Sequence, residues 1–166
     1  PWGDTLDLKK PEGTFRLYGM NPNGFRLDKT GGDITEFFQM AESIDANFVG
    51  CSEHNLDFTQ FRVQDTANKA IRNTGEHSKA VWSTTPTPFE SVYKPGGSMS
   101  CVIGNGVARV KKTGGNDLGR WSYIKLAGKD DRVITIVTVY QVCNQPTTAL
   151  NQDKCTAHAQ QRSLLI

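Results

Sequence analysis

The order of hydrophobic and polar positions predicts a strand, a helix and a second strand early in the chain. Residues Thr14–Gly19 alternate between apolar and polar side chains, as a half-buried strand does. Asp33 is expected to cap a helix, with Glu36 at the capping-box position. Phe48–Ser52, an apolar run after this helix, predicts a buried strand. The helix itself has apolar residues at helical spacing, namely Ile34, Phe37, Phe38, Ala41 and Ile44.

A second helix and a third strand are expected next. The spacing predicts a helix over residues 59–73, and Lys79–Thr84 is typical of a strand. Pro86 and Pro88 then exclude a central strand. The side chains expected to face inward from this helix are Phe61, Ala67, Ala70 and Ile71.

After Tyr93 the pattern changes to strands separated by glycine-rich turns. Residues 127–131 form a polar hairpin turn, and a last helix is expected over Thr156–Leu165. The segment Val133–Val139 is apolar on both faces, which predicts a central, covered strand. Its side chains expected to be nearly fully buried are Ile134, Ile136, Val137 and Val139. The strands predicted in this half are Ser98–Ile103, Val107–Val110, Arg120–Leu126 and Arg132–Tyr140.

These elements predict the fold class α/β (α+β), a layered β-sandwich flanked by helices. A strand, a helix and a buried second strand in this order are typical of α/β layers, and the later hairpins predict an antiparallel sheet. The 166 residues suit one domain. Residues 1–13 are polar and contain Pro and Gly, so we expect a leader there and a single domain over residues 14–166.

Composition limits the partners. The chain has 19 Lys and Arg against 17 Asp and Glu, so its net charge is +2. This balance excludes a strongly basic tail and argues against tight, non-specific DNA binding. The longest apolar run, around Val133–Tyr140, is too short and too rich in threonine to span a membrane, so no membrane partner is expected. No signal peptide is visible after Pro1.

Cysteine and histidine positions give little support to a metal cluster. The cysteines are far apart without a C-x-x-C pair, and three of them lie in apolar stretches. We expect reduced, structural thiols in a reducing compartment, and a disulfide framework is the alternative. These cysteines are Cys51, Cys101, Cys143 and Cys155. The histidines, expected in surface or capping roles, are His54, His77 and His158.

Polar side chains at three strand ends are the candidate functional residues. Asn21 and Asn23 follow the first strand, Glu53 follows the second, and Tyr140 ends the most hydrophobic one. Such groups can converge on one edge of a sheet sandwich, where ligands commonly bind. One carboxylate with neutral amides suits Mg²⁺, which fills its other positions with water and phosphate oxygens. In the alternative, Glu53 is a solvated loop residue and the asparagines form turns.

Three segments, in the same order, resemble motifs of the endonuclease/exonuclease/phosphatase superfamily. Gly19–Arg26 (G-M-N-P-N-G-F-R) is similar to its N-terminal motif, especially in the apurinic-endonuclease-like branch. Phe48–Asn55 (F-V-G-C-S-E-H-N) resembles the strand that ends in the metal-binding Glu, and Val133–Tyr140 resembles the strand that ends in the active-site Tyr. Gly96-Gly97 and Gly119-Arg120-Trp121 also look like the nuclease domains of eukaryotic retroelements.

The resemblance implies roles for the matching residues. Asn21 would bind or orient the scissile phosphate, Glu53 would hold Mg²⁺ (or Mn²⁺), and Tyr140 would contact the phosphate. Asn23 stands where many members carry Asp, which weakens a second metal contact. Asn144 is displaced from the Asn that often follows the tyrosine.

Two motifs of the family do not follow Tyr140 in this chain. They are an Asp-x-Asn, which supplies the general base and a phosphate ligand, and an Asp-His near the domain's end. Asp45-Ala46-Asn47 has matching letters but precedes Glu53 at a helix end. The resemblance therefore implies a partial fold, the N-terminal part of one superfamily domain truncated at its C-terminus.

The function that this resemblance implies is a Mg²⁺-dependent phosphodiesterase of the DNA endonuclease type, present here as a partial and inactive segment. DNA would be the partner of the complete domain, with no small-molecule cofactor and an intracellular, nuclear location. The alternatives are a non-catalytic relic or binding module, or a phosphatase or lipid phosphodiesterase of the same superfamily. Half of a sandwich would also expose apolar surface and favour aggregation or partner pairing.

Overall fold

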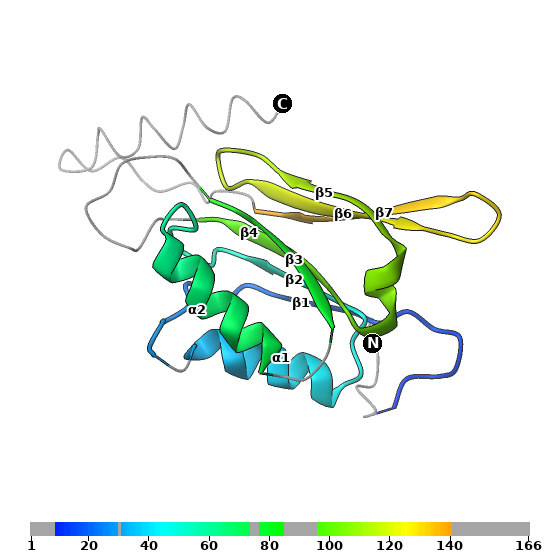
Figure 1. Cartoon of the computed structure of the whole chain (residues 1–166), viewed down its shortest axis with the longest axis horizontal. Helices are drawn as coiled ribbons and strands as arrows, with labels where there is room; N and C mark the ends of the chain where they lie inside the picture. The colour runs from blue at the N-terminus through cyan, green and yellow to red at the C-terminus, as the bar shows by residue number, and fades with distance from the viewer. Residues whose placement is uncertain (1–8, 30, 74–76, 85–95, 141–166) are drawn as a thin grey trace.

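Two β-sheets stack face to face, and two helices cover the outer face of the first sheet (Figure 1). The computed structural model describes residues 9–29, 31–73, 77–84 and 96–140. This arrangement confirms the predicted α+β fold class of layered sheets flanked by helices. The elements are β1 (Leu17–Met20), α1 (Asp33–Ser43), β2 (Phe48–Ser52), α2 (Phe61–Arg72), β3 (Ser78–Ser83), β4 (Ser98–Ile103), the 3₁₀ helix η1 (Gly104–Arg109), β5 (Val110–Gly115), β6 (Trp121–Ala127) and β7 (Val133–Val139).

The first sheet has one parallel pair, and this pair positions the candidate site. Its strand order is β1-β2-β4-β3, in which β1 runs parallel to β2 and the other neighbours are antiparallel. The register pairs Met20 with Cys51, so both strands end at the same edge. Asn21 and Glu53 come directly after these ends. The second sheet, β5-β6-β7, is antiparallel throughout.

The core lies in two layers, one on each face of the first sheet. Helices α1 and α2 pack their apolar faces on one side of it, where Met99 and Cys101 of β4 belong to the larger cluster of buried residues. The other face meets the second sheet through a smaller cluster that contains Phe48, Val102 and Ile124. Strand β4 is therefore covered on both faces, and all six of its residues are buried.

The buried cysteines agree with the predicted structural thiols. Cys51 and Cys101 are free and buried in the core. Burial raises the pKa of the Cys101 thiol to about 12, and burial also raises the pKa of Cys51. Both thiols therefore stay protonated and unreactive at neutral pH. Cys143 and Cys155 lie outside the described residues.

The prediction that Val133–Val139 is a central, buried strand is wrong. This segment forms β7, which lies at the edge of the three-stranded sheet. Among the four side chains expected to be buried, Ile134 is 54% exposed and Val139 is 59% exposed, because no described element covers the outer face or the open edge of β7. Hydrophobicity on both faces identified a strand correctly, but the position of a strand in its sheet decides its burial.

Local details also differ from the predictions. Gly32, not Asp33, is the N-cap of α1, with φ of 52° and no side-chain cap. The Asp33 carboxylate instead accepts hydrogen bonds from Arg26, which holds the pKa of Asp33 below its usual value. Phe61, expected to face inward, is 81% exposed at the start of α2. The predicted strand Val107–Val110 lies mostly in η1.

Of the remaining predictions, one is confirmed and others concern residues that the structure does not describe. The hairpin turn at residues 127–131 is confirmed, with Gly128 N donating to Arg132 O at 2.6 Å. The predicted helix over residues 156–165 lies outside the described residues, as do residues 1–8 of the expected leader. None of the helices in the described ranges has both the length and the apolar character needed to cross a membrane.

The unequal burial of two adjacent strands predicts unequal losses of stability. Ile124→Ala on β6 removes a fully buried side chain and should lower the free energy of unfolding by about 2–5 kcal/mol. Ile134→Ala on β7 makes the same chemical change at a half-exposed position and should cost about 1 kcal/mol or less. Urea unfolding of both variants measures the difference. Equal losses would contradict the placement of β7 at the edge.

Candidate functional site

The Glu53 carboxylate lies between two polar side chains from distant parts of the sequence. Asn21 Nδ2 donates to Glu53 Oε2 at 2.8 Å, and Tyr140 Oη donates to Glu53 Oε1 at 3.4 Å. Asn21 follows β1, Glu53 follows β2, and Tyr140 follows β7 of the second sheet. Glu53 is partly exposed, whereas the Tyr140 side chain is mostly buried. The structure therefore brings together the three main residues that the sequence pointed to.

The turn after β1 holds Asn21 toward Glu53. Asn23 N donates to Asn21 Oδ1 at 2.9 Å, which leaves the Nδ2 group of Asn21 turned to the carboxylate. Gly24 N then donates to Glu53 O at 2.7 Å and fastens the turn to the next loop. The Asn23 side chain is exposed with φ of 51°, so Asn23 acts here as a turn residue. Asn144 lies outside the described residues.

A segment of two glycines fixes the loop that carries Glu53. Glu53 N donates to Gly97 O at 2.7 Å, and Asn55 N donates to Gly96 O at 2.8 Å. A third hydrogen bond joins the same segments, in which Gly96 N donates to the side-chain Oδ1 of Asn55 at 2.7 Å. Glu53 and Asn55 have φ of 64° and 55°, a left-handed conformation that costs a non-glycine residue energy and persists only where neighbours enforce it.

Both glycines also allow close approach of a ring. A Cβ on Gly97 would lie 2.3 Å from the His54 ring, and a Cβ on Gly96 would lie 2.8 Å from Tyr140 Cε1. Both residues have positive φ, of 94° and 87°. Only glycine satisfies the space and the backbone conformation together at these positions.

His54 is buried directly beneath the loop, so the expected surface role is wrong for it, whereas its ring does cap a backbone N–H. Its Nε2 lies 3.0 Å from Ser83 O and its Nδ1 accepts from Leu56 N at 3.1 Å, which assigns the neutral tautomer with the proton on Nε2. Burial lowers the pKa of His54 to about 4. The sequence signal was its place beside Glu53 at the end of a buried strand.

The two sheets approach closely beside the site because small and hydroxyl-bearing residues face each other there. Ser100 Oγ lies 2.9 Å from Ser122 Oγ and 2.9 Å from Thr138 Oγ1. Gly50 of β2 faces Thr138, where a Cβ would lie 2.5 Å from Oγ1. This close packing brings the end of β7, and with it Tyr140, over the end of β2.

The donor set fits a hard divalent cation held by one protein carboxylate. Each Glu53 oxygen accepts one hydrogen bond from the chain and keeps a further lone pair. Within the described ranges, no three His, Cys, Asp or Glu side chains cluster closely enough to bind a metal ion together. A cation at Glu53 would take its other ligands from water and substrate, which is common for Mg²⁺.

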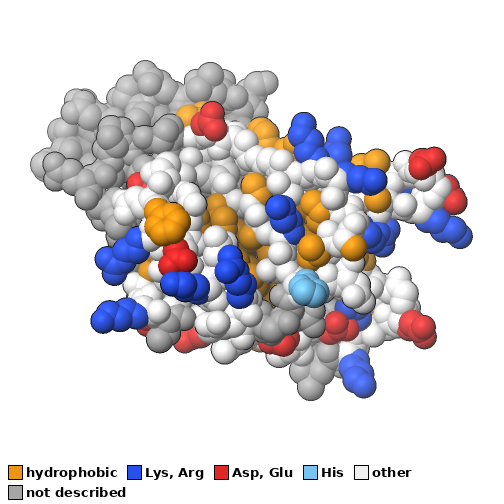
Figure 2. All heavy atoms as spheres, viewed as in Figure 1, with side chains coloured by type: hydrophobic (Ala, Val, Ile, Leu, Met, Phe, Trp, Pro, Cys, Tyr) orange, Lys and Arg blue, Asp and Glu red, His pale blue; other side chains and the backbone are white. Residues whose placement is uncertain are grey.

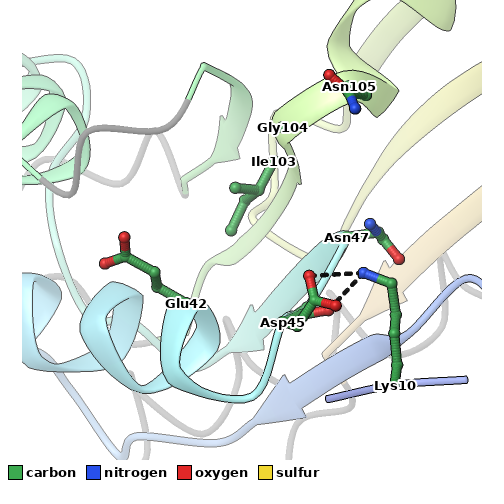
Figure 3. Close-up of a pocket in the computed structure, with 8 residues that line it drawn as sticks. Lys10, Glu42, Asp45, Asn47, Ile103, Gly104 and Asn105 are labelled. Atoms are coloured by element: carbon green, nitrogen blue, oxygen red, sulfur yellow. Dashed lines mark hydrogen bonds and ion pairs between the residues drawn. The ribbon is translucent and has the colours of Figure 1, made fainter. Parts of the chain in front are cut away.

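A polar cavity at the opposite end of the first sheet does not reach this site. It has a volume of about 250 Å³ and lies where α1 ends and β2 begins (Figure 3). Glu42, Asp45 and Asn47 line it, and Lys10 Nζ pairs with Asp45 Oδ1 at 2.7 Å. The ion pair neutralises Asp45, and the Glu42 carboxylate lines the same cavity.

Open grooves reach Asn21 from two sides. One, of about 440 Å³, runs between β1 and β7 and is lined by apolar side chains such as Leu17 and Val137. The other, of about 470 Å³, runs between the turn after β1 and helix α1, past Arg26. Asn21 belongs to the lining of both grooves.

No protein-family model matches this chain, and no curated protein matches it. The comparisons therefore neither support nor oppose the resemblance to the endonuclease/exonuclease/phosphatase superfamily. A functional assignment depends on the geometry around Glu53 and on the sequence motifs themselves.

The close approach at Gly97 predicts a large loss of stability on adding one methyl group. Gly97→Ala combines left-handed strain with a clash against the buried His54 ring and should cost about 3 kcal/mol or more. Gly13→Ala is the matched control, because Gly13 also has positive φ but no atom lies within 4 Å of its Cβ position. It should cost about 1 kcal/mol. Urea unfolding distinguishes them, and equal costs would show that the ring contact is unimportant.

The buried neutral His54 predicts a loss of stability in mild acid. Its folded-state pKa of about 4 lies below its ordinary value of 6.5, so the unfolded chain takes up a proton first as the pH falls. Stability is therefore full above pH 6.5 and decreases toward pH 4, by on the order of 1 kcal/mol per pH unit.

A pair of glutamine substitutions isolates this effect. His54→Gln keeps an acceptor for Leu56 N and a donor for Ser83 O, and should remove this part of the pH dependence in urea unfolding. His77→Gln changes an exposed histidine and should keep the wild-type slope. The same slope in all three proteins would rule out His54 as its source.

Proposed function

We propose that this chain carries the metal-binding and phosphate-positioning part of a Mg²⁺-dependent phosphodiesterase that acts on DNA. The observation that carries the proposal is the Glu53 carboxylate, held between the Asn21 amide and the Tyr140 hydroxyl at one accessible sheet edge. The order of the three sequence motifs supports the same assignment. Glu53 would hold Mg²⁺, or Mn²⁺ in its place.

The side chains beside Glu53 suit a phosphodiester. The Asn21 Nδ2 group has two hydrogens, one of which goes to Glu53, so the other can donate to a phosphate oxygen. The Tyr140 hydroxyl is a donor and an acceptor and could turn from Glu53 to a bound phosphate. A bound divalent cation would polarise the phosphoryl oxygen and stabilise charge on the leaving oxygen.

Turnover by the described residues alone should be slow. His54 is next to Glu53 but is shielded from solvent, and backbone groups occupy both of its ring nitrogens. It cannot accept a proton from an attacking water. General base catalysis contributes about 10²–10⁴-fold to such reactions, so we assign binding and positioning, and not water activation, to this set of residues.

The surface charge suggests that the site itself selects the substrate. The net charge is only +2, and Figure 2 shows Lys and Arg side chains spread over the visible face and not gathered into one patch. Such a surface gives little non-specific attraction to a polyanion. Binding of DNA would therefore depend mainly on contacts of the cation, Asn21 and Tyr140 with one phosphate.

The test of the proposed function is metal binding by the carboxylate. Glu53→Gln should bind Mn²⁺ at least about tenfold more weakly than the wild-type chain in calorimetric titration, because loss of the anionic ligand leaves only neutral donors. Glu42→Gln removes the same charge from the cavity at the other end of the sheet and should bind Mn²⁺ as the wild type does. Equal Mn²⁺ affinity in Glu53→Gln and wild type would overturn the proposal.

A further inference from the structure

Arg120, a buried arginine, lies directly opposite Tyr140 where the neighbouring strands β6 and β7 of the second sheet pair. Tyr140 N donates to Arg120 O at 2.7 Å, which continues the β6–β7 ladder one residue beyond the Trp121 and Val139 pair. Residues opposite each other in an antiparallel pair have side chains on the same face. Arg120 and Tyr140 therefore form a cross-strand pair on the inner face, at the end of the sandwich where Glu53 lies.

The two side chains are in contact. The Arg120 guanidinium carbon lies 5.4 Å from the centre of the Tyr140 ring, within the range of a cation–π interaction. Gly96 lies close to the same ring, at the distance that a Cβ would block. The ring is therefore bounded by the guanidinium and by the glycine backbone, and these contacts restrict where its hydroxyl can lie.

The turn before β6 holds Arg120 in place. Asn116 Oδ1 accepts from Arg120 N at 2.6 Å and from Trp121 N at 3.2 Å. Gly119 takes φ of 70° to complete the turn. These bonds fix the backbone of Arg120. A long side chain on a fixed backbone has a better-defined position than one on a mobile loop.

Burying this charge is costly unless nearby groups compensate for it. Arg120 is 2% exposed, and burial lowers its pKa from the ordinary value, whereas the interaction with Tyr140 raises it. Arginine nevertheless remains protonated in proteins. The guanidinium therefore brings a permanent positive charge against the Tyr140 ring, which an apolar residue of similar size would not do.

We propose that Arg120 is a positioning residue that holds the Tyr140 ring so that its hydroxyl faces the Glu53 carboxylate. Arg120 thereby sets the distance from the Tyr140 hydroxyl to the Glu53 carboxylate, beside which a cation and a phosphate would bind. This inference deepens the proposed function and depends on it for the identity of the ligand, but the placement of Tyr140 can be measured without any ligand.

The experiment follows Tyr140 by fluorine NMR in the full chain labelled with 3-fluorotyrosine. The chain has four tyrosines, and the Tyr140→Phe variant assigns the Tyr140 resonance. Arg120→Met removes the charge with similar length, and Arg120→Lys retains a cation. Arg109→Met is the control, because it removes an exposed arginine of η1 that donates to Ala127 O, at the end of β6 away from Arg120. Each spectrum is recorded without metal and with Mn²⁺, whose paramagnetism broadens nearby resonances.

The inference predicts that Arg120→Met shifts the metal-free Tyr140 resonance toward that of free fluorotyrosine and reduces its broadening by Mn²⁺ several-fold. Mn²⁺ affinity should stay at the wild-type level, because Glu53 is intact. Arg120→Lys should restore most of the wild-type spectrum, and Arg109→Met all of it.

An unchanged Tyr140 resonance in Arg120→Met would overturn the inference. So would unfolding of both Arg120 variants, since the residue would then serve the fold and not the ring. If Mn²⁺ fails to bind even the wild-type chain, the proposed function fails, and the metal-free spectra still decide the role of Arg120.

Discussion

The candidate site depends on the contact between the Gly96-Gly97 segment and the loop that carries Glu53. Two backbone hydrogen bonds join these segments, and the Asn55 side chain accepts a third from Gly96 N. The bonds hold Glu53 in a left-handed conformation and direct its carboxylate to the sheet edge. The same glycines leave room for the His54 ring below and the Tyr140 ring beside them. A larger residue at either position would displace a ring. The need for glycine here therefore links the loop backbone, the buried His54 and the site residue Tyr140.

Chain topology supplies the other part of the arrangement. Because β1 and β2 are parallel and end at the same edge, the amide of Asn21 reaches the carboxylate of Glu53 although the two residues are far apart in sequence. The second sheet adds Tyr140 only because the sheets approach closely where Ser100 meets Thr138. The parallel β1–β2 pair therefore places Asn21 beside Glu53, and the antiparallel second sheet places Tyr140 beside them.

Much of the fold was predictable from periodicity, and the exceptions have physical causes. Helices and strands follow from local spacing, so α1, α2 and most strands lie where the pattern put them. Burial of a strand depends on its neighbours, which local pattern does not contain. For this reason β4, with its serines, is the fully buried strand, and the more hydrophobic β7 lies at an edge.

The same distinction applies to the site. Asn21, Glu53 and Tyr140 were identifiable because each follows a strand, and strand ends can meet at one edge. His54 stands beside Glu53 in the sequence, but its burial and that of Arg120 were not predictable, because they depend on partners in β3, in β4 and just after β7. Asp33 illustrates the local case, since Arg26 takes the carboxylate that the capping pattern had assigned to the helix.

The most direct test of this account is a crystal structure of the chain soaked in Mn²⁺, with the ion located by its anomalous scattering. A Mn²⁺ peak is expected in coordination contact with a Glu53 carboxylate oxygen, with the Asn21 amide and the Tyr140 hydroxyl on either side of it. A peak in the cavity lined by Glu42 and Asp45, or a Glu53 side chain turned away from Asn21 and Tyr140 with no peak beside it, would contradict the account.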